Sequence, residues 1–210
     1  GGSTGNSIET TVVQLTADAL GVRTEDVNTI QGDTAVTGFG AGAAGSRSGS
    51  MTAGAIRETA SILRERIKAI AAHRFEAAVE DIDLVDSRAS VRGTPSISIS
   101  LAELAAAAYF DPYSLPPGVP AGLEAVGRYT SEARQIWVNA THLCTCELDI
   151  ATGQVTLLRY IVSEDCGPMI NPNVVEGQIA GGAVQGIGGA LYEHLAYDDD
   201  GNPVATTFMD

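Results

Sequence analysis

The chain is poor in aromatic residues, cysteine and basic residues, and these shortages exclude several classes of protein. Of its 210 residues, 5% are aromatic, three are cysteines and 12 are basic, against 26 acidic residues. The net charge of −14 argues against binding to nucleic acid or to an anionic membrane surface. Three cysteines are too few for a disulfide framework, which favours a reducing compartment. No apolar run approaches the roughly 20 residues that a membrane span needs.

Hydrophobic residues make up 44% of the chain, which is enough for a sizeable core of aliphatic side chains. No basic stretch followed by a short apolar segment opens the sequence, so no secretory signal is visible and we expect a cytoplasmic protein. Both ends look cut, because no methionine opens the chain and residues 207–210 read as part of an apolar strand. We therefore expect a fragment of something larger.

Hydrophobic spacing and capping residues predict four helices. Apolar residues that recur every three or four positions mark the first two. Ser100 and Glu103 form a capping box that opens the third, and Asn173 and Glu176 are expected to form another at the start of the fourth. The helices are expected over residues 8–20, about 46–75, 101–109 and from 171 onward.

Strands are expected over residues 27–30, 82–85 and 97–99, and as a hairpin over 136–150 and 155–163. Because the strands come in hairpins with helices between them, the pattern predicts the α+β class, with mixed or antiparallel sheets packed by helices. Residues 111–122 hold four of the eight prolines, which is typical of a boundary. We therefore expect two lobes, residues 1–112 and 123–210, joined by a linker over 113–122.

A first glycine-rich stretch precedes the second predicted helix. Residues 40–45 form a literal G-x-G-x-x-G, the dinucleotide fingerprint, which is a weak signal alone. The classical fold needs a strand that ends in an acid about 20 residues further on, whereas here Glu65 lies inside the expected helix. A nucleotide-binding module remains an alternative. Ser46, Arg47 and Ser48 place hydroxyls and a cation at a helix start, which suits either an anionic ligand or an ordinary serine cap.

The last predicted helix carries a second glycine-rich stretch, with six glycines between residues 177 and 189. Each costs about 1 kcal/mol relative to alanine in a helix interior, so something must offset them. Helical spacing gathers Gly181, Gly182 and Gly189 with Gln178 and Gln185 into a shallow trough, opposite a predicted core stripe. The trough either packs against another helix, as in a non-catalytic interaction domain, or takes a flat heterocycle. The predicted stripe comprises Ala180, Val184, Ile187, Leu191 and Leu195.

Histidine and cysteine alternate in the predicted hairpin, but they give little support for a metal site. His142, Cys144 and Cys146 would share one face of a strand. Their spacing matches no common zinc pattern, and buried cysteines are common in β-structure. Cys166 would need a nearby histidine to act as a nucleophile. We expect neither a metal ligand set nor a catalytic residue here.

Seven short segments, taken together and in order, resemble the C-terminal part of the large subunit of the molybdenum hydroxylases. This family includes xanthine dehydrogenase, aldehyde oxidoreductase and aerobic carbon monoxide dehydrogenase. The resemblance extends over essentially the whole chain. The segments are residues 5–11, 30–34, 45–48, 147–149, 152–155, 165–172 and 175–188.

The resemblance implies a molybdopterin cofactor, in bacteria usually the cytosine dinucleotide form. The family's Gly-Gln-Gly, whose glutamine reaches the metal, matches Gly5, Asn6 and Ser7, so that an amide one methylene shorter replaces the glutamine and a serine replaces the second glycine. Gln178 matches the glutamine that binds the pterin. The loop that binds the pterin and its dinucleotide tail matches Gly45, Ser46, Arg47 and Ser48.

The resemblance also implies what this chain lacks. The family's catalytic base is a glutamate in a Gly-x-Gly-Glu motif, which no residue here matches, so no catalytic residue is expected in this chain. Electrons are expected to leave through 2Fe–2S clusters and FAD on partner domains or subunits of a hetero-oligomer. We expect part of the cofactor cradle of an oxidoreductase that hydroxylates a purine, aldehyde or N-heterocycle, or oxidises carbon monoxide with water as oxygen source. The isolated chain is expected to be inactive.

Overall fold

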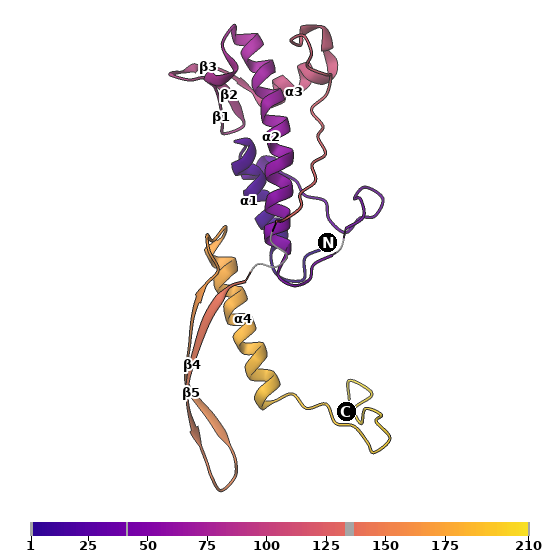
Figure 1. The fold of residues 1–210 in the computed structure, drawn as a ribbon, viewed down its shortest axis with the longest axis vertical. Helices are drawn as coiled ribbons and strands as arrows, with labels where there is room; N and C mark the ends of the chain where they lie inside the picture. Colours follow the sequence, from indigo (N-terminus) through magenta and orange to yellow (C-terminus); the bar gives the residue numbers. More distant parts are fainter. Residues whose placement is uncertain (1, 41, 133–136, 210) are drawn as a thin grey trace. The chain divides into compact units, whose positions relative to one another are not determined.

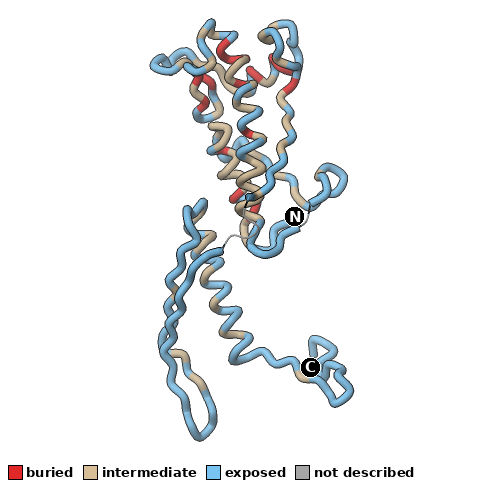
Figure 2. The backbone as a smooth tube through the Cα atoms, viewed as in Figure 1, coloured by how far each residue is buried: buried red, intermediate tan, exposed pale blue. Residues whose placement is uncertain are grey.

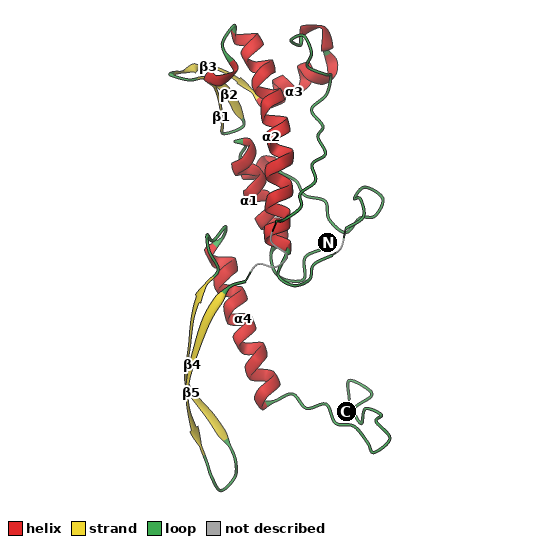
Figure 3. Ribbon diagram, in the orientation of Figure 1, coloured by secondary structure: helices red, strands yellow, loops and turns green. Residues whose placement is uncertain are grey.

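A computed structural model describes residues 2–40, 42–132 and 137–209 of the chain (Figure 1). Helices alternate with antiparallel sheets, which confirms the predicted α+β class (Figure 3). Contacts divide the chain into two compact units, Gly1–Ile136 and Trp137–Asp210. The first unit contains α1 (Ile8–Leu20), α2 (Ser48–Phe75), β1 (Ile82–Val85), β2 (Arg88–Val91), β3 (Thr94–Ser100) and α3 (Leu101–Phe110), and the second contains β4 (Asn139–Leu148), β5 (Val155–Asp165) and α4 (Pro172–Leu191).

The core of the first unit lies where the C-terminal half of α2 meets the three-stranded antiparallel sheet and α3. Its largest fully buried side chains are Ile70, Ile82 and Leu104, one from each of these elements. Burying such a side chain stabilises the fold by roughly 1.5–3 kcal/mol. Alanines from α2, β2 and α3 fill the spaces between them, so the elements approach closely. The capping box of Ser100 and Glu103 at the start of α3 is confirmed.

Helix α1 packs against α2, and Gly21 at the end of α1 brings the chain close to β1. Gly21 ends α1 in the left-handed region, with φ 71°. A β-carbon at this position would clash with the backbone carbonyl of Leu84 in β1. Glycine is therefore required here both for backbone conformation and for close approach. This position fixes the end of α1 against the sheet.

Residues 113–122, the predicted linker, pack on the first unit. Leu115, Val119 and Leu123 lie against its core. Arg66 of α2 donates a hydrogen bond from Nη1 to the carbonyl oxygen of Glu124 at 2.9 Å. Contacts therefore divide the chain later than the prolines indicated, at the boundary between residues 136 and 137. Prolines shape this segment as it runs over the surface of the unit.

The second unit consists of the β4–β5 hairpin, α4 and a C-terminal segment, and none of its described residues is buried (Figure 2). The hairpin is antiparallel, as predicted, with an irregularity between Thr145 and Cys146. Ile136, where the sequence placed the start of this hairpin, lies outside the described residues. A two-stranded ribbon with one helix is marginal in water. This unit therefore needs further protein to cover it.

The core stripe predicted for α4 is wrong. The half-buried positions that repeat every four residues are Val175, Ile179, Ala183 and Ile187, and only the last belongs to the predicted stripe. Ala180, Val184, Leu191 and Leu195 are exposed. The small residues around this helix make its periodicity weak, so the neighbouring hairpin, which contacts α4 through β5, decides which side is covered.

Three local predictions also differ from the structure. Residues 27–30 form no strand, and residues 207–209 form none either, while Asp210 lies outside the described residues. The cap of α4 is Asn171, whose side chain accepts a hydrogen bond from the amide of Val174 at 3.2 Å. Asn173 and Glu176 therefore do not form the predicted capping box, because Pro172 already occupies the first helical turn.

Candidate functional site

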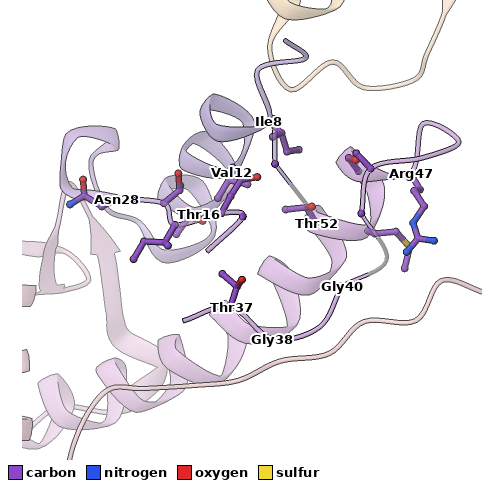
Figure 4. A pocket seen from close by; sticks show the side chains of 18 of the residues that line it. Ile8, Val12, Thr16, Asn28, Thr37, Gly38, Gly40, Arg47 and Thr52 are labelled. Carbon is purple, nitrogen blue, oxygen red and sulfur yellow. The ribbon is translucent and has the colours of Figure 1, made fainter. Parts of the chain in front are cut away.

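A cavity of about 540 Å³ lies in the first unit, between α1, the start of α2 and two loops (Figure 4). In Figure 4, Val12 and Thr16 of α1 stand on one side, Thr52 belongs to α2, and Thr37 and Gly38 belong to one of the loops. Small-molecule sites have volumes in this range. Ala41, part of the glycine-rich loop, lies outside the described residues. The lining loops are residues 27–32 and the described part of 37–43.

The polar side chains that line the cavity are one arginine and several neutral groups. Arg47 is the one charged residue among the described lining residues, and no carboxylate is present, although the chain has 26 acidic residues. Such a lining suits a ligand that is anionic or rich in hydrogen-bond acceptors. The neutral polar side chains are Thr16, Asn28, Thr29, Gln31, Thr37, Ser48 and Thr52.

The loop before α2 owes its path to left-handed backbone conformations. Gly42, Gly45 and Ser46 have φ values of 72°, 57° and 56°. A β-carbon at either glycine would have no atom within 4 Å, so conformation rather than close approach explains these glycines. Serine rarely adopts this left-handed conformation, and residues held in such rare conformations concentrate at functional sites. The loop therefore carries local strain at the position matched to the cofactor-binding loop.

The start of α2 has no side-chain cap. Arg47 occupies the cap position, and Ser46 and Ser48 do not cap the helix, so the interpretation of these serines as an ordinary cap is not what the structure shows. Ser50 instead donates from Oγ to the carbonyl oxygen of Arg47 at 3.1 Å. The first amides of α2 point out of the helix without a side-chain partner among the described residues, and together with the helix dipole they favour an anion.

The predicted residues of the Gly5–Ser7 segment stand beside this cavity rather than in its lining. Asn6 is half-buried, and its Oδ1 accepts long hydrogen bonds of 3.4 Å from Ser3 and Thr4 in its own loop. Ser7 precedes α1 with φ 52° and makes no side-chain cap. Glycine adopts this conformation without cost, which gives a physical reason for the glycine that the resemblance places at this position.

Gln31 is a lining residue that sequence reasoning missed as a candidate. The side chain is half-buried, its Nε2 is shielded from solvent, and no hydrogen-bond partner for that atom is found among the described residues. Leaving a buried amide donor unsatisfied costs about 1–3 kcal/mol. Its place within residues 30–34, one of the segments that carried the resemblance, is the sequence signal that could have drawn attention to it.

Gln178 lies in the second unit, on α4, so its surroundings are described apart from the cavity. Its side chain is exposed. A β-carbon at Gly177, Gly181 or Gly182 would meet no atom within 4 Å, so this side of α4 is open. The helix therefore presents a small-residue face next to the exposed side chain of Gln178.

The histidine and cysteines of the hairpin do not converge. Nδ1 of His142 lies 3.0 Å from the hydroxyl of Tyr160 on the neighbouring strand. Across residues 2–40, 42–132 and 137–209, no group of three histidine, cysteine, aspartate or glutamate residues is placed to hold a metal ion. The thiol of Cys166 is exposed, and its described hydrogen bond goes to the carbonyl oxygen of Gly167.

Three carboxyl groups with a lowered pKa, Asp26, Asp83 and Asp198, lie outside the cavity lining. A hydrogen bond from Arg92 lowers the pKa of Asp83 in β1, and a hydrogen bond from Arg23 lowers the pKa of Asp26 after α1. Backbone amides, chiefly that of Asn202, lower the pKa of Asp198. None of these three lines the cavity. They stabilise local structure and leave the cavity without an acid or base of its own.

A classical dinucleotide fold is contradicted by the sheet topology. The strand that should precede the glycine-rich loop is missing, since residues 27–30 are not a strand. Both described sheets are antiparallel, whereas that fold needs a parallel sheet with its first strand at the centre. The G-x-G-x-x-G at residues 40–45 is therefore not a Rossmann fingerprint.

A family model and curated relatives identify the same family of proteins. The model of the molybdopterin cofactor-binding domain family matches residues 1–210. The nicotine 6-hydroxylase large subunit of Paenarthrobacter nicotinovorans is 39% identical over 208 residues, which are 99% of this chain and 25% of that protein. The carbon monoxide dehydrogenase large chain of Hydrogenophaga pseudoflava is 34% identical over 206 residues, 98% of this chain and 25% of that protein.

Solved structures agree with the sequence comparison. The crystal structure of quinoline 2-oxidoreductase from Pseudomonas putida 86 matches with a TM-score of 0.88 and 43% identity, over 100% of this chain and 26% of that one. A copper- and molybdenum-containing carbon monoxide dehydrogenase matches with a TM-score of 0.85 and 32% identity, again over 100% and 26%. The chain thus spans about a quarter of the length of these relatives.

Proposed function

Because the chain belongs to the molybdopterin cofactor-binding domain family and corresponds to part of a molybdenum hydroxylase large subunit, we propose that it forms part of the cofactor cradle of an enzyme that hydroxylates a carbon centre or oxidises carbon monoxide. The relatives include proteins named for nicotine and quinoline at 39% and 43% identity, above the 34% of a carbon monoxide dehydrogenase. An N-heterocycle is therefore the favoured substrate class, with water as oxygen source.

The observation that carries this proposal is the acid-free cavity beside the start of α2. About one residue in eight of the chain is acidic, so a set of 19 residues taken from it would hold about two carboxylates, and the described lining holds none. Arg47, Ser48 and the uncapped amides of α2 are suited to the phosphates of a dinucleotide form of the cofactor. The unpartnered amide of Gln31 indicates that a polar group is needed nearby. The residues present therefore fit a dinucleotide form of the molybdenum cofactor.

Each part of the chain has a distinct task in this proposal. Arg47 and Ser48 bind the anionic end, and Gly45 and Ser46 hold the strained loop that presents them. Gln178 binds the pterin from the open side of α4, and the segment with Gly5 and Asn6 lies toward the metal. When bound, the molybdenum cofactor supplies the redox and oxygen-transfer chemistry, while the protein binds and orients it.

The relatives support the proposed partners, and the composition supports the proposed location. Their names include a large subunit, a large chain and a complex subunit gamma, which supports a hetero-oligomer. We propose that FAD and 2Fe–2S clusters lie on its other domains or subunits, and that the cofactor is the cytosine dinucleotide form. In the part of the chain that the structure describes, no helix has the length and apolar character needed to cross a membrane. A cytoplasmic location is proposed on the strength of the composition.

Gln178 gives the variant that tests the cradle. In the full-length protein, Gln178→Leu is expected to lower bound molybdenum and the retained pterin about tenfold, because one hydrogen bond to the ligand is lost. Gln185→Leu is the matched control, since Gln185 is also an exposed glutamine on α4. The measurements are elemental analysis and fluorescence of the oxidised pterin released from the purified protein.

The outcomes separate this proposal from an interaction domain. If α4 is only a packing surface, both variants change stability alike and cofactor loading is unchanged. A full-length protein that oxidises an N-heterocycle and carries no molybdenum would overturn the proposed function altogether.

A further inference from the structure

We propose that Gln31 is a ligand-binding residue of the first unit's cavity, and that its carboxamide binds the edge of a nucleobase while Arg47 binds the phosphate of the same nucleotide. The inference deepens the proposed function and rests on it, because the nucleotide is taken to be the tail of the cofactor. It concerns a residue outside the set that the resemblance matched to the cofactor.

The side-chain amide of Gln31 has a buried donor without a hydrogen-bond partner among the described residues. Its Nε2 is sealed from water, and the described residues offer it no acceptor, while the residue itself lines the cavity. An unsatisfied buried donor is unfavourable, so a side-chain rotation that gives the amide a partner in the cavity is favoured when such a partner is present. The ligand must therefore bring a hydrogen-bond acceptor close to residues 27–32.

The cavity has a charged side and an amide side. Arg47 and Asn28 stand at opposite sides of it (Figure 4). Gln31 belongs to the same loop as Asn28, so both carboxamides come from residues 27–32 and the guanidinium comes from the start of α2. A ligand that spans the cavity meets a cation at one end and amides at the other. A nucleotide has this polarity, with phosphate at one end and base at the other.

The chemistry of the amide favours a base over a second phosphate. A carboxamide offers a donor and an acceptor side by side, which matches the edge of a heterocyclic base, whereas a phosphate offers acceptors alone. Apolar side chains of Val12, Val27 and Met51 line the same cavity and can cover the faces of such a ring. The absence of carboxylates among the described lining residues removes repulsion of the phosphate.

The test uses the full-length enzyme, prepared both with cofactor and from a host that cannot make it. The variants are Gln31→Leu and Gln31→Glu, with Gln154→Glu as control, because Gln154 is an exposed glutamine in the β4–β5 turn of the other unit. Nucleotide released by acid is identified and counted against molybdenum, and thermal unfolding is recorded for both forms. These readouts do not depend on turnover.

Gln31→Leu is expected to affect the melting temperature differently in the cofactor-free and the cofactor-loaded protein. Gln31→Leu leaves the melting temperature of the cofactor-free protein unchanged or raised, because an unsatisfied donor is removed. In the loaded protein it lowers the melting temperature, and retained nucleotide falls about tenfold after dilution. Gln31→Glu shows the same nucleotide loss, since it removes the donor and adds a negative charge, while Gln154→Glu matches the wild type.

Two outcomes would overturn the inference while leaving the proposed molybdenum hydroxylase activity intact. One is a wild-type enzyme that carries molybdenum and releases bare molybdopterin without a nucleotide, which would also overturn the proposed dinucleotide form of the cofactor. The other is a Gln31→Leu variant that loses stability equally with and without cofactor, which would mean that another part of the protein fills the cavity. A wild-type enzyme without molybdenum, by contrast, would overturn the proposed function and this inference together.

Discussion

Arg47 gives the sharpest functional prediction, because it is the one charged residue among the described residues that line the cavity. Replacing it with methionine keeps the length of the side chain and removes the guanidinium. A hydrogen bond to a charged group is worth roughly 1.5–3 kcal/mol, which corresponds to a 10- to 150-fold change in affinity. Since Arg47 is exposed and screened by solvent, the lower part of this range is expected.

The assay compares Arg47→Met with Arg57→Met in the full-length protein. Arg57 is exposed on the same helix and lies outside the cavity lining, so it controls for the loss of a surface charge. Molybdenum and nucleotide retained after gel filtration are measured at low and high salt. Arg47→Met is expected to lose at least tenfold more cofactor than the control and to show a weaker dependence on salt. Equal retention by both variants would refute the assignment of Arg47 to the anionic end.

Two further predictions concern the scaffold. Gly21→Ala is expected to lower the free energy of unfolding by about 3 kcal/mol or more, because it combines an unfavourable left-handed alanine with a clash against Leu84. Gly93 has a similar backbone conformation, with φ +80, and a β-carbon there would meet nothing within 4 Å, so Gly93→Ala should cost only about 1 kcal/mol. Urea unfolding measures both losses, and equal losses would contradict the clash. Asp83, whose pKa is lowered by the hydrogen bond from Arg92, contributes stability above its unfolded-state pKa and loses it as the pH falls through the lowered value. The difference in melting temperature between wild type and Asp83→Asn should therefore be greatest near neutral pH and vanish in acid below about pH 4, and a difference that grows in acid would contradict the sign.

Local signals in the sequence were sufficient for most of the secondary structure. The apolar spacing of α1 and α2, the capping box of Ser100 and the turn between β4 and β5 are short-range features, and the structure confirms them. The strand predicted at residues 27–30 failed for a different reason. Val27 and Ile30 line the cavity and do not pair in a sheet.

The parts that could not be predicted depend on contacts distant in sequence. The covered side of α4 is decided by the β4–β5 hairpin, and Val184 of α4 and Leu195 beyond it stay exposed. The resemblance of residues 30–34 could have drawn attention to Gln31, but its unpartnered amide could not be predicted, because that is a property of the folded surroundings. Arg47 and Ser48 line one cavity, and their binding of the cofactor stays a prediction.

Hydrogen–deuterium exchange on the full-length protein, with and without its cofactor, tests the central claim most directly. The account predicts that loading slows exchange in peptides covering residues 27–32, 42–52 and 172–189, because these segments bind the cofactor. Slower exchange elsewhere in the protein, with no change in these three segments, would contradict the cradle.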